Sequence, residues 1–334
     1  MSSTPHASAD RSTLGVAVEA VRRASAACVS VQHRLAAGDA ITKGDDSPVT
    51  AADFAAQAVV CATLVEALGT GIELVGEEDS SDLTDPDHAE LLATVQDITS
   101  TGLGRSVAAD DVVRWIDVGA SDGTTDRYWT LDPIDGTKGF LRGDQFAVAL
   151  ALIDEGQVVL GVLGCPNLPT PDGGVGAIFA ADAHGTVSHG LPSDTTIDQP
   201  IRVASPATVA ESRFCESVES GHSDHSQSQQ IADLLGITSD PYRIDSQCKY
   251  AAVARGDASI YLRLPTRADY VEKIWDHAAG KFVVERAGGT VSDVEGRPLD
   301  FSHGARLSAN RGVVATSGAF HDQVIDAVTR VLNA

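Results

Sequence analysis

The segment from Trp129 to Phe146 reads WTLDPIDGTKGFLRGDQF and places two carboxylates, Asp132 and Asp135, on either side of a Pro-Ile pair. Carboxylates three residues apart across a proline-stiffened turn can converge on Mg²⁺, which prefers oxygen ligands. Gly136 and Thr137 follow at once and can offer backbone N–H groups and a hydroxyl to a phosphate oxygen. Asp-Pro and Asp-Gly pairs also mark ordinary turns, so the chemistry depends on partners elsewhere in the chain.

Two further acidic motifs lie far away in the sequence: GEED at 76–79 and WDHAAG at 275–280. Carboxylates gathered from three distant segments indicate a functional site. The candidate metal ligands are Glu77, Asp132, Asp135, Asp276 and the backbone carbonyl of Ile134. Two hard cations about 3.5–4 Å apart, sharing such carboxylates, could clamp a phosphoryl group and lower the pKa of a water molecule.

Length and composition describe a globular protein. The 334 residues suffice for about two domains, and 43% hydrophobic with 21% charged residues is typical of a soluble chain. No run approaches the roughly 18 apolar residues of a membrane helix, so no membrane span is expected. The N-terminal segment lacks the apolar core of a signal peptide, which favours a cytoplasmic location and leaves organellar import open.

The chain is strongly acidic, with 47 Asp and Glu against 24 Lys and Arg and a formal net charge of -23. This charge opposes binding to nucleic acid, because a duplex binder needs a basic surface to displace counterions. Adaptation to salt and the composition of a GC-rich genome would both produce such a surface. The five cysteines show no C-x-x-C spacing and are expected to be reduced core thiols.

Apolar periodicity predicts a long helix over 14–35 that ends near 38, and a second helix that begins at 48–50. The run at 71–79 predicts a short buried strand that places Glu77 at a sheet rim. The acidic stretch 80–127 is expected to form an irregular, exposed insertion or flap with one short helix.

Four β-rich runs follow, YWTLD, QFAVALALI, QVVLGVLGCP and GAIFAA, and predict an antiparallel sheet. From about residue 205 onward, short strands alternate with helices, which predicts a layered α/β arrangement. The chain is therefore expected to contain an α+β domain over 1–205, with most of the metal ligands, and a smaller α/β domain over 206–334.

Four motifs in order, S-P-V-T-x-A-D, G-E-E, D-P-I-D-G-T and W-D-H-A-A-G, resemble the lithium-sensitive, magnesium-dependent phosphatase superfamily that includes inositol monophosphatase. The resemblance runs from about Ser47 to the C-terminus. It implies the layered αβαβα sandwich of the inositol monophosphatase-like (sugar phosphatase) fold, which combines α+β and α/β features. It also implies two or three Mg²⁺ ions per active site and inhibition by lithium.

Three other stretches resemble the 3'(2'),5'-bisphosphate nucleotidases within that superfamily: KGFLRGDQFAVALALI, the segment from Ser220 to His225, and DSQCKYAAVARG followed by YLRLP. Lys138 stands where the inositol monophosphatases usually carry Asn. The implied reaction removes the 3'-phosphate of 3'-phosphoadenosine 5'-phosphate, with its 5'-phosphosulfate as a second candidate substrate. This resemblance also implies a part in sulfur assimilation, whereas salt tolerance is suggested by the acidic composition alone.

The same resemblance implies roles for individual residues. Asp53 and Thr137 would form a dyad that orients and deprotonates the attacking water. Gly136, Thr137, His222, Ser246, Lys249, Arg263 and Asp276 would contact the substrate. A nucleotide that carries two phosphates needs fixed cations at close range in so acidic a chain, and Arg and Lys supply them. Asp224 departs from the expected pattern, because it would repel a phosphate if it pointed inward.

Several alternatives remain open at this level. Inositol polyphosphate 1-phosphatase or inositol monophosphatase activity is the first alternative, and a catalytically inactive nucleotide sensor is a remote one. Lys138 and Arg142 either help to dock a phosphate or lie on the surface. The His222 to His225 segment has the look of part of a zinc site, but no further ligands follow at suitable spacing. The expected partner is a small-molecule nucleotide, with no nucleic acid and no membrane, and a monomer is favoured over a dimer.

Overall fold

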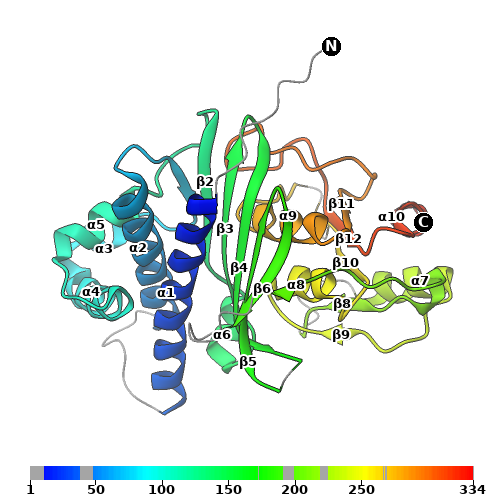
Figure 1. Ribbon diagram of the computed structural model, residues 1–334, viewed down its shortest axis with the longest axis horizontal. Coiled ribbons are helices and arrows are strands. Elements are labelled where there is room, and N and C mark those ends of the chain that lie inside the picture. Colours follow the sequence, from blue (N-terminus) through cyan, green and yellow to red (C-terminus); the bar gives the residue numbers. More distant parts are fainter. Residues whose placement is uncertain are drawn as a thin grey trace.

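The computed structural model describes residues 11–37, 48–171, 173–190, 199–218, 225–265, 267 and 269–333. Two sheets alternate with three layers of helices (Figure 1). The helices are α1 (Arg11–Ala36), α2 (Pro48–Leu68), α3 (Ser81–Thr84), α4 (Ala89–Leu103), α5 (Ala109–Asp117), α6 (Thr137–Arg142), α7 (His225–Leu235), α8 (Cys248–Arg255), α9 (Ala278–Arg286) and α10 (His321–Leu332), with 3₁₀ turns η1 (Pro86–His88) and η2 (Val209–Glu211).

In the described residues, the first sheet has seven strands, and their order in space follows their order in sequence: β1 (Leu74–Gly76), β2 (Arg127–Asp135), β3 (Ala147–Asp154), β4 (Gln157–Pro169), β5 (Val175–Asp182), β6 (Gly185–Gly190) and β7 (Gln199–Pro200). β1 and β2 are parallel, and each later pair is antiparallel. The four β-rich runs therefore form the predicted antiparallel sheet.

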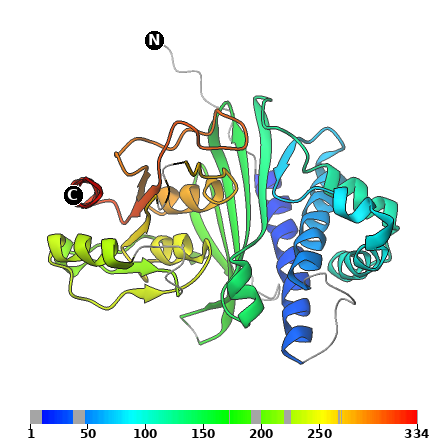
Figure 2. The same ribbon diagram turned by 180° about the vertical axis from the view of Figure 1, so that it is seen from behind.

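Strand β3 explains why these runs are apolar throughout. Its Val148, Leu150 and Leu152 join the core under α1 and α2, whereas the alternate alanines at 147, 149 and 151 join the core under α8 and α9. Helices cover both faces of the sheet (Figure 2), so both sets of side chains are buried. The small residues on one face admit α9, which packs closely on β4.

Helix α2 is the central helix of the first core, where Phe54, Ala58 and Cys61 are buried. The stretch Thr50–Leu68 is long and apolar enough to cross a membrane by composition, but 78% of its window is buried inside the protein. Its apolar character is accounted for by packing against α1, α4 and α5. The expectation that the chain has no membrane span stays a prediction.

The stretch from 80 to 127 differs from the irregular, exposed insertion that its composition suggested. It contains α3, α4 and α5, and apolar residues of the last two, among them Val95, Ile98 and Ile116, are buried in the first core. Acidic residues face the solvent while a stripe at helical spacing packs onto α2. The high acidic content obscured this amphipathic pattern.

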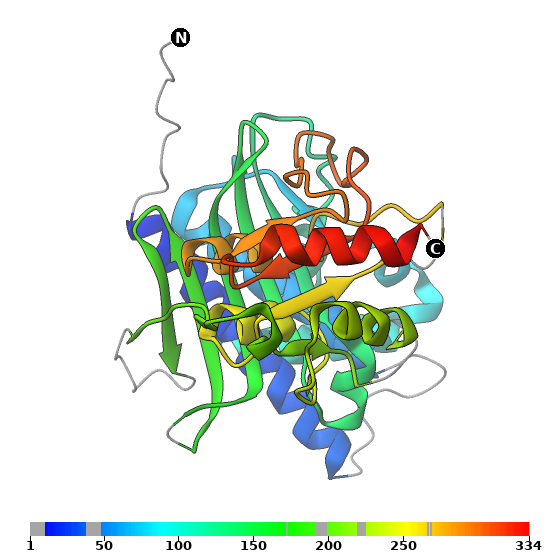
Figure 3. The same cartoon turned by 90° about the vertical axis from the view of Figure 1, so that its right-hand side faces the viewer.

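Within the part of the chain that the structure describes, the second sheet has five strands in the order β11 (Thr290–Ser292), β12 (Val313–Thr316), β10 (Ile260–Arg263), β8 (Phe214–Glu216) and β9 (Tyr242–Arg243). Helices α8 and α9 lie between the two sheets, and α7 and α10 lie together on the outer face of the second sheet (Figure 3). Strands alternate with helices as predicted. One core joins both sheets through α8 and α9, and the division into two domains near residue 205 stays a prediction.

Candidate active site

The acidic motif lies at the end of β2, where the pairing of β2 with β3 is irregular. Asp132 pairs with Ala149 and Asp135 with Ala147, so three residue steps on β2 oppose two on β3. In a regular strand, residues three apart point to opposite faces, and the extra residue of a bulge brings them back to one side. The two carboxylates are therefore brought together by a bulge within the strand, where the sequence suggested a turn.

Gly136 links the bulge to α6, whose first residue is Thr137. Its φ of +93° lies in the left-handed region, and a Cβ there would lie 2.7 Å from the Cβ of Ser246. Only glycine fits both constraints. Ser246 itself has a φ of +65°, an uncommon conformation for a residue with a side chain. The Asp-Gly-Thr turn and the loop before α8 are thus in direct contact.

The loop that carries Glu77 is held by Gln57, one helical turn after Asp53 on α2. The amide nitrogen of Gln57 donates to the Glu78 carbonyl at 2.6 Å and to the Ile116 carbonyl at 3.1 Å. The Glu78 N–H donates to Gln57 Oε1 at 3.2 Å. One buried side chain therefore fixes the exit of β1 relative to α2.

Asp132 is the most enclosed carboxylate of the group, with 2% of its surface exposed. Burial raises its pKa well above the usual value, and the negative charges of Glu77, Asp135, Asp276 and Asp53 raise it further. The charges of the other four acidic residues therefore lie close enough to act on the Asp132 carboxyl. The three distant motifs are therefore gathered together in space.

Burial and neighbouring negative charges also raise the pKa values of Asp53 and Glu77. Burial, followed by the charges of Glu78 and Glu77, raises the pKa of Asp53. The Glu77 side chain is partly exposed, but its carboxyl group is surrounded by protein. This desolvation, together with the negative charge of Glu78, raises the pKa of Glu77 to about 7. Such a cluster is costly as free anions, and a divalent cation would relieve the repulsion.

The donor set fits a hard metal ion. Asp132 Oδ1 is buried and has no hydrogen-bond partner among the described residues, which is unusual for a carboxylate oxygen. The neighbouring donors are all carboxylate oxygens, and Mg²⁺ prefers these to nitrogen or sulfur. A cation at this position would satisfy the orphaned oxygen.

A cavity of about 400 Å³ opens beside the acidic cluster. Seven of the residues predicted as ligands or substrate contacts line it: Asp135, Gly136, Thr137, Ser246, Lys249, Arg263 and Asp276. Lys138 and Arg142 also line it. Arg142 is paired with Asp245 and lies 2.9 Å from Asp144. Asp53, Glu77, Asp132 and Ile134 are not among the lining residues, whereas Asp135 and Asp276 belong both to the acidic cluster and to the cavity wall.

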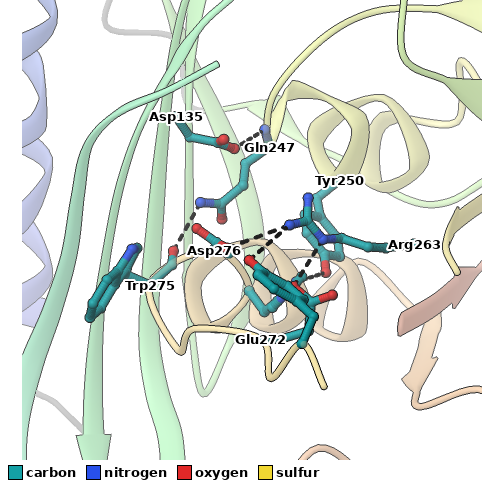
Figure 4. A network of polar contacts seen from close by, with 9 residues as sticks. Asp135, Gln247, Tyr250, Arg263, Glu272, Trp275 and Asp276 are labelled. Atoms are coloured by element: carbon teal, nitrogen blue, oxygen red, sulfur yellow. Dashed lines mark hydrogen bonds and ion pairs between the residues drawn. The ribbon is translucent and has the colours of Figure 1, made fainter. Parts of the chain in front are cut away.

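The cations of the cavity are held by buried groups. Lys249 is buried, and its Nζ lies 5.3 Å from the centre of the Tyr261 ring. Arg263 Nε donates to Glu272 Oε2 at 2.9 Å, and Arg263 Nη2 lies 3.8 Å from Asp276 Oδ2 (Figure 4). Fixed cations beside an acidic cluster can bind an anion that also meets the metal.

A second acidic group consists of Glu272, Asp276 and His277, whose ligand atoms lie within 4.8 Å of one another. Glu272 already accepts from Arg263 and lies 3.1 Å from His277 Nε2. A guanidinium within this group disfavours a further cation. We therefore assign the group to the support of Arg263, with Asp276 facing the first cluster.

The remaining predictions of site residues divide into two sets. His222 and Asp224 lie outside the described residues, so the substrate contact expected of His222 and the zinc-like pattern stay predictions. The metal-binding role of the Ile134 carbonyl and the Asp53–Thr137 dyad also stay predictions, although Asp53 and Thr137 both lie at the site.

Sequence reasoning missed residues that act through backbone or buried contacts. Gln247 N–H donates to Asp135 Oδ2, and its side chain donates to the Trp275 carbonyl at 2.9 Å. The sequence likewise did not indicate that Gln57, Asp245 and Glu272 belong to the site. Gln247 and Asp245 flank Ser246 in the D-S-Q-C-K stretch, which was the one available signal.

A family model and the similar curated proteins point to the same family. The family model described as "Inositol monophosphatase family" matches residues 10–333. A protein of Schizosaccharomyces pombe named 3'(2'),5'-bisphosphate nucleotidase is 43% identical, covering 95% of this chain and 94% of the relative. A Dictyostelium discoideum protein of the same name is 40% identical, covering 94% and 96%.

Solved structures share the fold at lower identity. Inositol monophosphatase from Anabaena superposes with a TM-score of 0.61 at 20% identity, and 95% of each chain is covered. CysQ from Bacteroides thetaiotaomicron gives a TM-score of 0.60 at 21% identity, covering 92% of this chain and 97% of that one. The αβαβα sandwich expected from the motifs is confirmed. From its motifs, its fold and these relatives, the chain belongs to the inositol monophosphatase family.

Proposed function

We propose that this chain is a Mg²⁺-dependent 3'(2'),5'-bisphosphate nucleotidase that removes the 3'-phosphate of 3'-phosphoadenosine 5'-phosphate. The observation that carries the proposal is a single cavity lined both by the acidic Asp135–Thr137 turn and by Lys249 and Arg263. An acidic metal cluster alone would suit any phosphate monoester. Two fixed cations in the same cavity favour a substrate with a second phosphate, and the names of the similar proteins support the nucleotide.

The inositol monophosphatase family is generally metal-dependent, and the acidic cluster is suited to Mg²⁺. The residues that would hold two or three ions are Glu77, Asp132, Asp135 and Asp276, with the Ile134 carbonyl. Bound Mg²⁺ supplies Lewis acidity toward phosphate oxygens and toward a water molecule.

The chain's own residues would bind, orient and move the proton. Asp53 would accept a hydrogen bond from the Thr137 hydroxyl. As Thr137 Oγ1 takes the proton of the water that attacks phosphorus, the hydroxyl's own proton passes to the Asp53 carboxylate. Ser246, Lys249 and Arg263 hold the nucleotide and the phosphate that is not cleaved. Attack in line with the 3'-oxygen breaks the P–O bond, the leaving 3'-oxygen takes a proton from a solvent water molecule, and the products are AMP and phosphate.

Phosphate release tests this function directly. The purified protein is incubated with Mg²⁺ and, separately, with 3'-phosphoadenosine 5'-phosphate, inositol 1,4-bisphosphate and inositol 1-phosphate. We expect the nucleotide to be the best substrate, with activity lost after chelation and reduced by Li⁺. Faster release from an inositol phosphate would favour the inositol phosphatase alternative. Tight nucleotide binding without release from any substrate would favour a sensor.

A further inference from the structure

A buried chain of hydrogen bonds runs behind Arg263 (Figure 4). Tyr250 Oη lies 2.8 Å from His277 Nδ1, and His277 Nε2 lies 3.1 Å from Glu272 Oε2. Glu272 Oε2 in turn lies 2.9 Å from Arg263 Nε. The first three residues are buried, and of the four only Arg263 lines the cavity.

The direction of each hydrogen bond follows from the groups involved. A carboxylate only accepts, so His277 Nε2–H and Arg263 Nε–H both donate to Glu272. When the imidazole carries a proton on Nε2 alone, Nδ1 accepts from the Tyr250 hydroxyl. One arrangement therefore satisfies every group in the chain, and a fully satisfied buried network is rigid.

Close packing of α8 on α9 holds Tyr250 at the far end of this chain. A Cβ on Gly280 would lie 2.2 Å from the Tyr250 ring, so the glycine of the WDHAAG motif is what admits the ring. Tyr250 also meets Tyr261 edge to face, with ring centres 4.9 Å apart. Since Lys249 lies over Tyr261, the same buried residues support both cavity cations.

Glu272 determines where the rest of the Arg263 guanidinium points. Arg263 Nη2 lies 3.5 Å from Tyr270 Oη and 3.8 Å from Asp276 Oδ2, and Nη1 has no hydrogen-bond partner among the described residues. The guanidinium is planar, so a fixed Nε fixes the direction of the other four N–H groups. Without Glu272, Asp276 would be the remaining anionic partner, and rotation toward it would withdraw donors from a substrate phosphate.

We propose that Glu272, held by His277 and Tyr250, is a positioning residue that aims Arg263 at the second phosphate and so sets the preference for bisphosphate substrates. The inference rests on the proposed nucleotidase function, because Arg263 would meet the phosphate that is not cleaved. A contact that is equal in the ground state and the transition state changes KM and leaves kcat nearly unchanged. The effect is therefore specific to substrates that carry the second phosphate.

The test compares Glu272→Gln with the wild-type protein on 3'-phosphoadenosine 5'-phosphate and on 3'-AMP, which lacks the 5'-phosphate. We expect KM for the bisphosphate to rise about tenfold, because the substitution replaces the charge-assisted hydrogen bond that holds Arg263 Nε by a weaker neutral one. The kcat for the bisphosphate and the kcat/KM for 3'-AMP should stay within about threefold, by the same reasoning on uniform binding. The inhibition constant of AMP, which carries the 5'-phosphate, should rise by the same factor as KM.

Two further variants keep the test decisive. Tyr250→Phe removes one hydroxyl at constant shape and should raise the same KM about threefold, as expected for one neutral hydrogen bond. If Glu272→Gln lowers the unfolding temperature too far for assay, the KM of Tyr250→Phe tests the positioning role instead. Glu216→Gln is the matched control, because Glu216 pairs with Arg243 at 3.4 Å in the same sheet and neither residue lines the cavity. This control should change neither KM nor the AMP inhibition constant.

Distinct results would overturn the inference and the function. The positioning role would be contradicted by any of three results in folded Glu272→Gln: an equal loss of kcat/KM on both nucleotides, a fall in kcat at constant KM, or unchanged inhibition by AMP. The nucleotidase function would stand in each case. A wild-type protein that releases phosphate from neither nucleotide would instead overturn the proposed function.

Discussion

Gln247 joins two of the predicted metal ligands. Its backbone N–H donates a hydrogen bond to Asp135 Oδ2, and its side chain donates to the carbonyl of Trp275, the residue before Asp276. The end of β2 and the loop before α9 are thus held together by one residue at the start of α8. The relative position of Asp135 and Asp276 depends on this residue.

Gln247→Ala should therefore loosen Asp276 while it keeps the backbone contact to Asp135. The buried Trp275 carbonyl would lose its donor, at an expected loss of about 1–3 kcal/mol in the free energy of unfolding. We expect kcat to fall and the Mg²⁺ concentration for half-maximal activity to rise. Denaturant unfolding and a Mg²⁺ titration measure the two effects. An unchanged Mg²⁺ requirement would show that Asp276 is held without Gln247.

Asp132 offers a test of the metal site that separates charge from packing. In the metal-free protein, Asp132→Asn removes one of several mutually repelling buried charges, so the unfolding temperature should stay the same or rise. Activity should fall by about a hundredfold or more, the loss expected for one strong electrostatic contact to the transition state.

Thermal unfolding with and without Mg²⁺ provides the control for this variant. The wild-type protein should be stabilised by Mg²⁺ according to its affinity, and Asp132→Asn should lose most of that stabilisation. A variant that is still stabilised by Mg²⁺ to the wild-type extent, with near wild-type turnover, would remove Asp132 from the metal site.

The proposed Asp53–Thr137 dyad predicts a specific pattern of kinetics. Asp53→Asn and Thr137→Ala should each lower kcat strongly, and the double variant should be little worse than either single variant, because the two residues act as one unit. Thr137→Ser keeps the hydroxyl and should retain most of the activity. Multiplicative losses in the double variant would mean that the two residues act separately.

The acidic motifs of the site could be predicted from the sequence, but the residues that hold these motifs in place could not. The continuous apolar run of β3 and the long apolar face of α1 both appear in the structure, where they form the strand and the helix that the sequence predicts. The acidic residues could be found because metal chemistry restricts the residue type. Gln57 and Glu272 could not, because glutamine or glutamate at a single position has no pattern, and their partners lie 21 and 9 residues away.

Gly136 can be tested against a matched glycine at the other end of α6. Gly136→Ala combines a φ of +93° with a Cβ 2.7 Å from Ser246, whereas Gly143 has a φ of +76° and open space around it. Gly143→Ala should cost about 1 kcal/mol from the left-handed conformation alone. Gly136→Ala should cost more and should also lower activity, because it displaces Ser246 or Thr137. Equal effects of the two variants on unfolding and on kcat would contradict the close contact between Gly136 and Ser246.

His321 should make stability depend on pH, far from the active site. Its ring lies 2.8 Å from Ser292 Oγ and 3.0 Å from Thr316 Oγ1, at the start of α10. Burial lowers its pKa below the usual value near 6.5, and the helix N-terminus also disfavours a positive charge. The unfolded chain thus binds a proton before the folded protein does, so stability is full above pH 6.5 and falls as the pH drops through the window below it. His321→Gln removes this group, so its free energy of unfolding should fall less than that of the wild type between pH 7.5 and pH 5.5. An equal or larger fall in the variant would show that His321 is not the group responsible.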